Sequence, residues 1–378
     1  MNKEIKLLAY YDDETNLAEN RLVSPAANNK LKYIIDVLKR LETRTEIISP
    51  CVTQKKQVFP GKEIQLNQFV KLKLFKTRGS SILIIKKIQN ALTMIRCFLY
   101  IKKASSCDTV LVYHSLYLMP IVRILKRKHC HIVLEVEEIY GDVKNNRKTK
   151  QKELRFFECA EAYIFPTHLL ETIINTQNKP SVIIHGTYQV EQDRNIRLFD
   201  KEHIHCVYAG TFDPRKGGCA AAAAAAFLPA NYHMHIIGFG SEQEISNMKQ
   251  MISEISQKSD ATVTFDGLKS GEEYIQFIQS CEIGLSTQNP DAAFNATSFP
   301  SKILSYLSNG LRVVSIRIPA IEQSAVGDMI SYYDKQTPEE IAKAILSIDL
   351  SKTYCSRKRI EELSRKFIDD FNRMLGDL

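Results

Sequence analysis

Residues 205–218 read HCVYAGTFDPRKGG and give the strongest indication of the fold. The first five are typical of a buried β-strand, and Gly210 then opens a short loop that ends in two glycines at the start of an alanine-rich helix. In such a turn, backbone N–H groups and the positive end of the helix dipole face the loop, which suits a diphosphate. We therefore predict anion contacts from Gly210, Thr211, Lys216 and Gly217. A purely structural turn, common in any α/β domain, is the alternative.

The same alternation of strand and helix extends in both directions from this loop. Strands separated by helices predict right-handed βαβ units and a parallel sheet. The predicted strands are 6–10, 45–48, 109–113, 131–136, 162–165, 181–184, 205–209, 233–237, 262–265, 283–286 and 312–316. The predicted helices include 28–41, 116–128, 220–227, 241–256, 271–280, 301–308 and a last one at 356–375.

A polar stretch at residues 185–202 interrupts the alternation and predicts a linker. We therefore expect two doubly wound, Rossmann-like α/β domains, residues 1–190 and 191–355. They are expected to face each other across a cleft at the carboxyl ends of their strands, where ligands of such sheets bind. Residues 356–378 are expected to form a C-terminal helix that packs back on the N-terminal domain.

The composition is that of a globular protein large enough for two separate cores. Of the 378 residues, 44% are hydrophobic and 25% are charged, which excludes disorder, collagen and a small disulfide scaffold. The nine cysteines form no CxxC pair, and the first residues lack the apolar run of a signal peptide. No run of about 18 apolar residues occurs, so a membrane span is not expected. These features predict reduced thiols and a cytoplasmic location.

Charge is distributed unevenly along the chain. Residues 1–190 carry 31 Lys and Arg against 18 Asp and Glu, whereas residues 191–378 carry 20 against 25. The segment from Phe69 to Lys103 concentrates the excess, because it holds nine basic residues, no acidic one, and many Leu, Ile and Phe. We expect it to bind an anionic membrane surface at the inner face of the cell membrane. A solvated basic helix on the core is the alternative, and without a nucleic-acid motif or Trp we expect no nucleic acid as partner. The nine residues are Lys71, Lys73, Lys76, Arg78, Lys86, Lys87, Arg96, Lys102 and Lys103.

A second loop-and-helix unit in the C-terminal half has the same character. Residues 295–310 read NATSFPSKILSYLSNG, in which Ser301 stands at the start of a helix and Lys302 projects from its first turn. Two anion sites on one edge of a sheet are what a nucleoside diphosphate requires. Gly240, in a third loop of this kind, is a further candidate, although its position also suits a tight turn.

The order of the motifs GTFDPRKGG, HIIGFGSEQ and SFPSKILSYLSNGLRVVS resembles the nucleotide-sugar-binding domain of GT-B glycosyltransferases. The similarity is to the retaining enzymes of family 4, also called glycosyl transferases group 1, and it covers residues 207–348. Lys216 and Gly217 match the first loop of that family, where Thr211 stands in place of an arginine. The N-terminal half is similar to the family's acceptor domain more loosely.

Two further positions depart from the family pattern. Thr297 and Ser305 stand where the family has two glutamates, one near the donor sugar and one on the ribose hydroxyls. A hydroxyl at Ser305 can still bond a ribose, but less strongly than a carboxylate does. The resemblance implies that the diphosphate of the donor is held by Lys216, Gly217, Ser301 and Lys302, without a metal ion or another cofactor.

The N-terminal domain offers His114 as a candidate catalytic residue. Residues 108–115 resemble the family's DVVHVH strand, whose terminal histidine lies by the transferred sugar. A structural histidine is the alternative reading of His114.

Glu138 is the second catalytic candidate. It follows the strand at 131–136 together with Glu135 and Glu137, and a carboxylate there can orient an acceptor hydroxyl or take its proton. The alternative is a solvated acidic turn that the basic run at 144–152 neutralises.

The resemblance implies a function that these residues can perform. It predicts a hexosyl- or related glycosyltransferase that moves a sugar from a nucleoside diphosphate sugar to a saccharide acceptor with retention of configuration. The expected acceptor is lipid-linked, as in the synthesis of bacterial capsule or O-antigen polysaccharides. Two alternatives remain: a catalytically inactive GT-B partner subunit, suggested by the two missing glutamates, and a nucleotide-sugar 2-epimerase of the same architecture.

Overall fold

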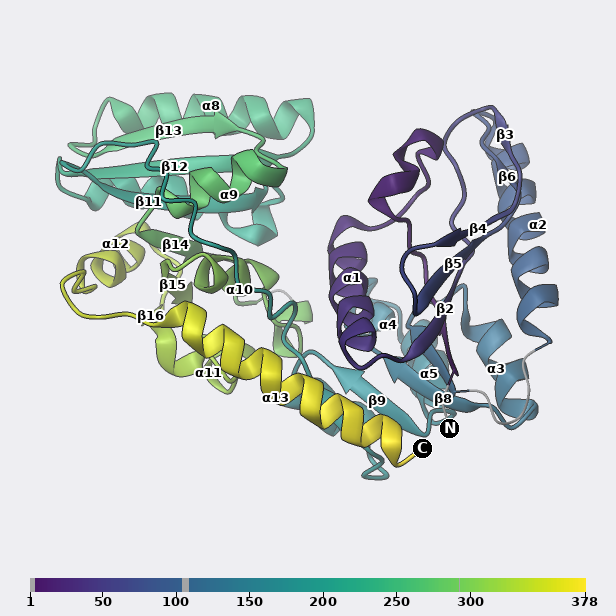
Figure 1. Cartoon of the computed structure of the whole chain (residues 1–378). Helices are drawn as coiled ribbons and strands as arrows, with labels where there is room; N and C mark the ends of the chain where they lie inside the picture. The colour runs from purple at the N-terminus through teal and green to yellow at the C-terminus, as the bar shows by residue number, and fades with distance from the viewer. Residues whose placement is uncertain (1–3, 104–108, 292) are drawn as a thin grey trace. The chain divides into compact units, whose positions relative to one another are not determined.

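The computed structural model describes residues 4–103, 109–291 and 293–378 (Figure 1). The chain divides into two compact units: unit 1 is Met1–Thr187 with Phe367–Leu378, and unit 2 is Tyr188–Lys366. Each unit has its own sheet with helices packed against it. Asp108, the first residue of the predicted strand at 108–115, lies outside the described residues.

Unit 1 contains an eight-stranded sheet in the order β10-β9-β8-β7-β1-β2-β5-β4. Every neighbouring pair is parallel except β4 with β5. β1 lies between β2 and β7, so the chain winds outward from the centre in both directions, as in doubly wound folds. The strands are β1 (Glu4–Leu8), β2 (Arg44–Ser49), β4 (Lys62–Gln65), β5 (Val70–Leu74), β7 (Thr109–Tyr113), β8 (His131–Glu135), β9 (Ala162–Phe165) and β10 (Ser181–Ile183), and β3 (Val58–Phe59) pairs with β6 (Thr77–Arg78) in a separate antiparallel ribbon.

Helices connect the strands of unit 1 and bury their apolar faces against the sheet. The central strands β7 and β8 are buried at nearly every position, as expected where both faces of a sheet are covered. The helices are η1 (Glu14–Glu19), α1 (Pro25–Arg40), α2 (Leu83–Ile101), α3 (Met119–Arg127), α4 (Tyr140–Val143), α5 (Arg147–Phe157) and α6 (His168–Ile174).

Unit 2 contains a six-stranded parallel sheet in the order β13-β12-β11-β14-β15-β16. The strands are β11 (Ile204–Thr211), β12 (Tyr232–Phe239), β13 (Thr262–Gly267), β14 (Ile283–Ser286), β15 (Arg312–Ile316) and β16 (Ile330–Tyr333). The helices are η2 (Pro214–Lys216), α7 (Gly218–Ala224), η3 (Ala225–Phe227), α8 (Glu242–Ser256), α9 (Gly271–Gln279), η4 (Ala293–Ala296), α10 (Ser301–Ser308), α11 (Pro319–Glu322), η5 (Gly327–Met329) and α12 (Pro338–Leu346).

The last helix, α13 (Ser356–Gly376), begins in unit 2, and its residues from Phe367 onward belong to unit 1. The Phe367 ring lies 6.0 Å from that of Tyr33 on α1 and 5.5 Å from that of Phe371. No helix of the described residues is long and apolar enough to cross a bilayer.

The prediction of parallel, doubly wound α/β sheets is confirmed. The basic segment at residues 69–103 differs from its prediction. Residues 69–103 were given a single basic helix as their alternative reading, but they form β5, β6 and then α2. The reason is the alternation Val70-Lys71-Leu72-Lys73-Leu74, whose apolar residues are buried in the sheet while the lysines stay partly exposed. Acids from neighbouring strands pair with these lysines: Glu46 with Lys71 and Glu63 with Lys73.

Candidate functional site

The order of strands in unit 2 reverses between β11 and β14, which are neighbours at the centre of the sheet. Ligands of open α/β sheets bind outside the carboxyl ends of the strands at such a switch point. The two loops that leave these strands contact each other. The Thr287 hydroxyl donates to the Gly217 carbonyl at 2.7 Å, and the Asn289 N–H donates to the Arg215 carbonyl at 3.0 Å. The loops therefore form one continuous surface at the switch point.

Two positions on this surface admit only glycine. Gly217 has φ +85°, and a Cβ on it would lie 1.7 Å from the Thr287 carbonyl oxygen. Gly238, at the end of β12, has φ +146°, and a Cβ there would lie 1.7 Å from the carbonyl oxygen of Gly210. The predicted glycine loops after β11 and β12 thus lie in close contact with neighbouring backbone at the switch point.

Lys302, on the first turn of α10, reaches the loop after β11. Its Nζ lies 4.0 Å from the centre of the Tyr208 ring and 3.5 Å from the Lys216 carbonyl oxygen. A Cβ on Gly210 would be only 3.2 Å from this Nζ. Burial, with the charge of Lys216 as a smaller cause, lowers the pKa of Lys302 to about 7. An anion bound beside Lys302 would offset the cost of its charge.

Tyr208 holds the shape of this loop. Its ring is fully buried, and its hydroxyl lies 2.9 Å from the carbonyl oxygen of Thr211 and 3.1 Å from that of Lys216. Tyr306 on α10 plays a similar part between the strands, because its hydroxyl accepts the Ala209 N–H at 2.8 Å and lies 3.3 Å from the Leu285 carbonyl oxygen. The side chain of Lys302 therefore lies over a loop whose shape is fixed by the hydrogen bonds of these two tyrosines.

Gln288, two residues beyond β14, was not among the predicted site residues. Its Oε1 accepts the Ser286 hydroxyl at 2.8 Å, while its Nε2 is buried and has no hydrogen-bond partner among the described residues. A buried amide donor without a partner is costly, and at a switch point it is suited to a ligand oxygen. The sequence signal was its position directly after the buried strand 283–286.

The remaining predicted donor residues lie in the same part of unit 2. Ser301 is exposed at the first position of α10, and the Ser305 hydroxyl one turn later lies 2.9 Å from that of Tyr274. Thr297 is half-buried in the segment before α10. Gly240 precedes the capping box of α8, where a Cβ on it would lie 3.0 Å from the Glu244 carboxylate.

His114, at the end of β7 in unit 1, is buried. Its Nε2 lies 2.9 Å from Oε1 of Glu153, which is also buried, and its ring packs against Phe156 and Phe157 with centroid distances of 5.7 and 4.8 Å. Glu153 also accepts the N–H groups of Tyr140 and Gly141 at 3.0 and 2.6 Å, so it fixes both the ring and the start of α4. Nδ1 of His114 is left without a partner among the described residues.

The acidic turn after β8 is not a solvated one. Lys30 on α1 makes ion pairs with Glu135, at 3.0 Å, and with Glu137. The alternative reading that the basic run at 144–152 neutralises this turn is therefore wrong for these two acids, because that run lies in or just before α5 and its Lys150 pairs with Asp142. Glu138 is half-buried next to them.

Burial and the charge of Lys30 shift the pKa values of the two acids in this cluster. Burial raises the pKa of the Glu135 carboxyl well above its usual range. Burial also opposes ionisation of Glu137, but the charge of Lys30 together with hydrogen bonds from Glu135 and Lys30 outweighs burial and lowers the pKa of Glu137. The three groups therefore form one buried cluster in which Lys30 favours ionised Glu137, while burial disfavours ionised Glu135. The sequence did not identify Lys30, because the contact joins residues more than a hundred positions apart.

Comparisons with known proteins place the fold. No family model matches the sequence, and a search of curated proteins found no match. Solved structures do match over nearly the whole chain. Sucrose-phosphate synthase from Thermosynechococcus elongatus superposes with a TM-score of 0.71 at 13% identity and covers 99% of this chain and 98% of its own.

Two further solved structures have the same architecture. HepE of Anabaena, in complex with UDP and glucose, has a TM-score of 0.65 at 12% identity over 100% of both chains. The lipopolysaccharide outer core galactosyltransferase WaaB has a TM-score of 0.61 at 14% identity over 99% of both chains. The predicted GT-B fold is thereby confirmed. At these identities the likeness defines the fold, and function must be argued from the site.

Proposed function

We propose that this protein is a glycosyltransferase that takes its sugar from a nucleoside diphosphate sugar bound to unit 2. The observation that carries the proposal is the half-buried Lys302, held over the Tyr208 ring at the β11–β14 switch point with its pKa lowered to about 7. A buried cation beside tight glycine loops is suited to a diphosphate. The complex of HepE with UDP-glucose is consistent with this assignment.

The chemistry follows from the charges at the site. Negative charge grows on the diphosphate as it leaves, so Lys216 and Lys302 bind the transition state more strongly than the ground state. Gly217 and Ser301 contribute backbone and hydroxyl donors, and the Nε2 of Gln288 is a further donor. We infer that these groups support departure of the diphosphate with retention at the anomeric carbon, as the family resemblance implies.

We propose that unit 1 binds the acceptor. Because Nε2 of His114 donates to Glu153, its partnerless Nδ1 carries a lone pair that can accept a hydroxyl of the transferred sugar. Glu138, beside the Lys30 cluster, is proposed to orient the attacking acceptor hydroxyl and to take its proton.

The acceptor is proposed to be a lipid-linked saccharide at an anionic membrane surface, and the support comes from α2. This helix has no acidic residue, and one face of it carries exposed apolar side chains. Ile84, Ile88, Ile95 and Leu99 are 52–69% exposed and are flanked by Lys86 and Lys87. Exposed apolar patches with basic neighbours are typical of helices that lie in the membrane interface. A place in bacterial surface polysaccharide synthesis agrees with this, as does the likeness to WaaB, a lipopolysaccharide outer core galactosyltransferase.

The test is a panel of nucleotide sugars read by thermal stabilisation. We expect at least one UDP- or GDP-sugar to raise the unfolding temperature in proportion to the logarithm of its concentration. Lys302→Met should weaken its binding by about 1–3 kcal/mol, since a charge-assisted bond is lost. Lys343→Met, at an exposed lysine of the same unit, should leave binding unchanged. Stabilisation by no member of the panel, or equal affinity in both variants, would contradict the proposal.

Nucleotide release separates the alternatives that share this fold. A transferase releases the nucleoside diphosphate only when an acceptor is present. A 2-epimerase converts the donor without any acceptor, and an inactive partner subunit binds the donor without turnover.

A further inference from the structure

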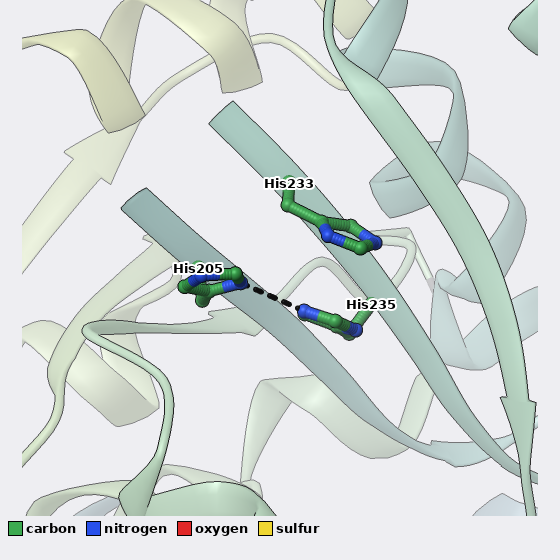
Figure 2. Close-up of side chains that lie close together, drawn as sticks. All are labelled: His205, His233 and His235. Carbon is green, nitrogen blue, oxygen red and sulfur yellow. Dashed lines mark hydrogen bonds between the residues drawn. The ribbon is translucent and has the colours of Figure 1, made fainter. Parts of the chain in front are cut away.

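Three histidines gather at the end of the unit 2 sheet that lies away from the proposed donor site. His205 on β11 and His233 on β12 are register partners, and His235 follows two residues later on β12. Because side chains alternate along a strand, all three lie on the same face of the sheet, as Figure 2 shows. His205 precedes Gly210 by five residues, about 16 Å along the strand. The cluster is therefore separate from the nucleotide site.

The inward-facing nitrogens of the cluster converge. Nδ1 of His205 lies 3.0 Å from Nε2 of His235, and the rings of His233 and His235 stack with centroids 3.9 Å apart. One nitrogen from each of the three residues lies within 4.8 Å of the others. His205 and His235 are buried, and His233 is half-buried.

The outward-facing nitrogens meet oxygen atoms. Nδ1 of His235 lies 3.1 Å from Oδ2 of Asp266, and Nε2 of His233 lies 3.0 Å from the Thr264 hydroxyl. Nε2 of His205 is buried without a hydrogen-bond partner among the described residues, and its nearest acid is Asp200, with Oδ1 3.9 Å away. Metal-binding histidines have this arrangement, because an oxygen behind the ring fixes the tautomer and the orientation.

The hydrogen bonds assign the lone pairs. Oδ2 of Asp266 is an acceptor, so His235 donates to it from Nδ1 and the lone pair of His235 lies on Nε2. The Thr264 hydroxyl donates to Asp266 at 2.7 Å, so it accepts from Nε2 of His233, whose lone pair then lies on Nδ1. Two of the three inward nitrogens are thus already free to bind a cation.

We propose that His205, His233 and His235 form a binding site for a divalent transition-metal ion, with Zn²⁺ as the expected ion. Imidazole nitrogens suit Zn²⁺, and Zn–N distances of about 2.0–2.1 Å put tetrahedral ligands roughly 3.3 Å apart. The closest pair is already at 3.0 Å, and rotation about the soft χ2 torsion of His233 would bring in the third. When the metal binds, the His205 ring changes tautomer, and its proton moves from Nδ1 to Nε2, which faces Asp200. The number of protons on the three rings stays the same.

The position of the histidine cluster indicates what a bound metal ion would do. A metal ion here would join β11 to β12 at the start of unit 2, beneath the Phe199 ring that stacks on His205 and His235 at 4.7 and 4.3 Å. It would stabilise unit 2 and would not take part in sugar transfer.

The test is titration of the chelator-treated full-length protein with Zn²⁺. We expect one ion per chain with a Kd below about 1 µM, and the visible absorption of a nitrogen-ligated Co²⁺ when Co²⁺ replaces Zn²⁺. His233→Gln, at the least buried of the three positions, should weaken binding at least about 100-fold. Asp266→Asn, behind His235, should weaken it about 10- to 100-fold. His168→Gln, at an exposed histidine of unit 1, should change nothing.

Two results would overturn the proposal: no stoichiometric binding by the wild-type chain, or full-strength binding in both His233→Gln and His205→Gln. Histidine ring resonances of the wild-type protein, followed during the Zn²⁺ titration, provide a reading that needs no variant. Three ring systems should shift in slow exchange, and unchanged rings count against the site. Donor binding by the chelated protein is measured separately, so failure here leaves the proposed function unaffected.

Discussion

Diphosphate binding beside Lys302 should be accompanied by the uptake of a proton. In the free protein its pKa is lowered to about 7, chiefly by burial, so above pH 7 the amine is mostly neutral. A bound diphosphate favours the charged form and raises that pKa, so binding at pH 8 must take up a large part of one proton. Calorimetry in buffers of different ionisation enthalpy should show this uptake, and it should vanish near pH 6, where Lys302 is already protonated.

Lys302→Met provides the control for that measurement. The variant should bind the same nucleotide more weakly and with no dependence of the enthalpy on the buffer. A buffer dependence that persists in the variant would assign the proton to another group.

His114 tests the role of unit 1. If its Nδ1 contacts the transferred sugar, His114→Ala should lower kcat about ten-fold or more while UDP binding is unchanged. Phe157→Leu, which alters packing against the same ring, should retain a kcat near that of the wild type. A His114→Ala enzyme that is only less stable, with normal turnover per folded molecule, would show that this histidine is structural.

At the scale of elements, the accuracy of the sequence predictions depended on how local the signal was. The strands at 109–113, 162–165, 283–286 and 312–316 have the predicted bounds because apolar runs and turn residues enclose them. The region from Val58 to Arg78 was missed because its strands are short and because β5 alternates lysine with apolar residues. Within it, β3 pairs with β6 and β4 with β5, and β5 also pairs with β2 from an earlier part of the chain.

How local the signal is also explains which site residues could be predicted from the sequence. Lys216 and Lys302 were identified because each lies beside a glycine loop or a helix start. Gln288, Lys30 and the histidine cluster depend on contacts across strands or between distant segments. For the histidines a signal was present, since HIH at 203–205 and HMH at 233–235 place histidines on one face of two strands, but only the register aligns them.

The exposed apolar face of α2 predicts that the protein binds anionic membranes. We expect binding to vesicles that contain anionic lipid, no binding to neutral vesicles, and loss of binding at high salt. Lys86→Gln with Lys87→Gln should weaken binding by about 2 kcal/mol in total, at about 1 kcal/mol for each cation. Replacing Ile84 and Ile88 by Ser should weaken it as well.

Two other lysines make a control with the same change in charge. Lys71 and Lys73 lie on β5 and pair with Glu46 and Glu63, so converting both to Gln should have a much smaller effect. Equal effects of the two double variants would mean that net charge acts alone and that α2 has no special part.

In the whole molecule, the two units are proposed to have different tasks. Unit 2 is proposed to hold the donor at its β11–β14 switch point, and its histidine cluster lies at the other end of the strands. Unit 1 carries the net positive charge, the exposed face of α2 and the buried groups proposed to contact the acceptor. This division requires that a nucleotide alone be recognised by unit 2.

Hydrogen–deuterium exchange of the full chain with saturating UDP, and separately with GDP, tests this most directly. At least one nucleotide should slow amide exchange in peptides that cover residues 210–218 and 287–302, the two loops at the switch point and the start of α10. Peptides of β7, β8 and α2 in unit 1 should exchange at the same rate with and without nucleotide. Protection in unit 1 instead, or no protection in either loop at saturation, would contradict the central claim.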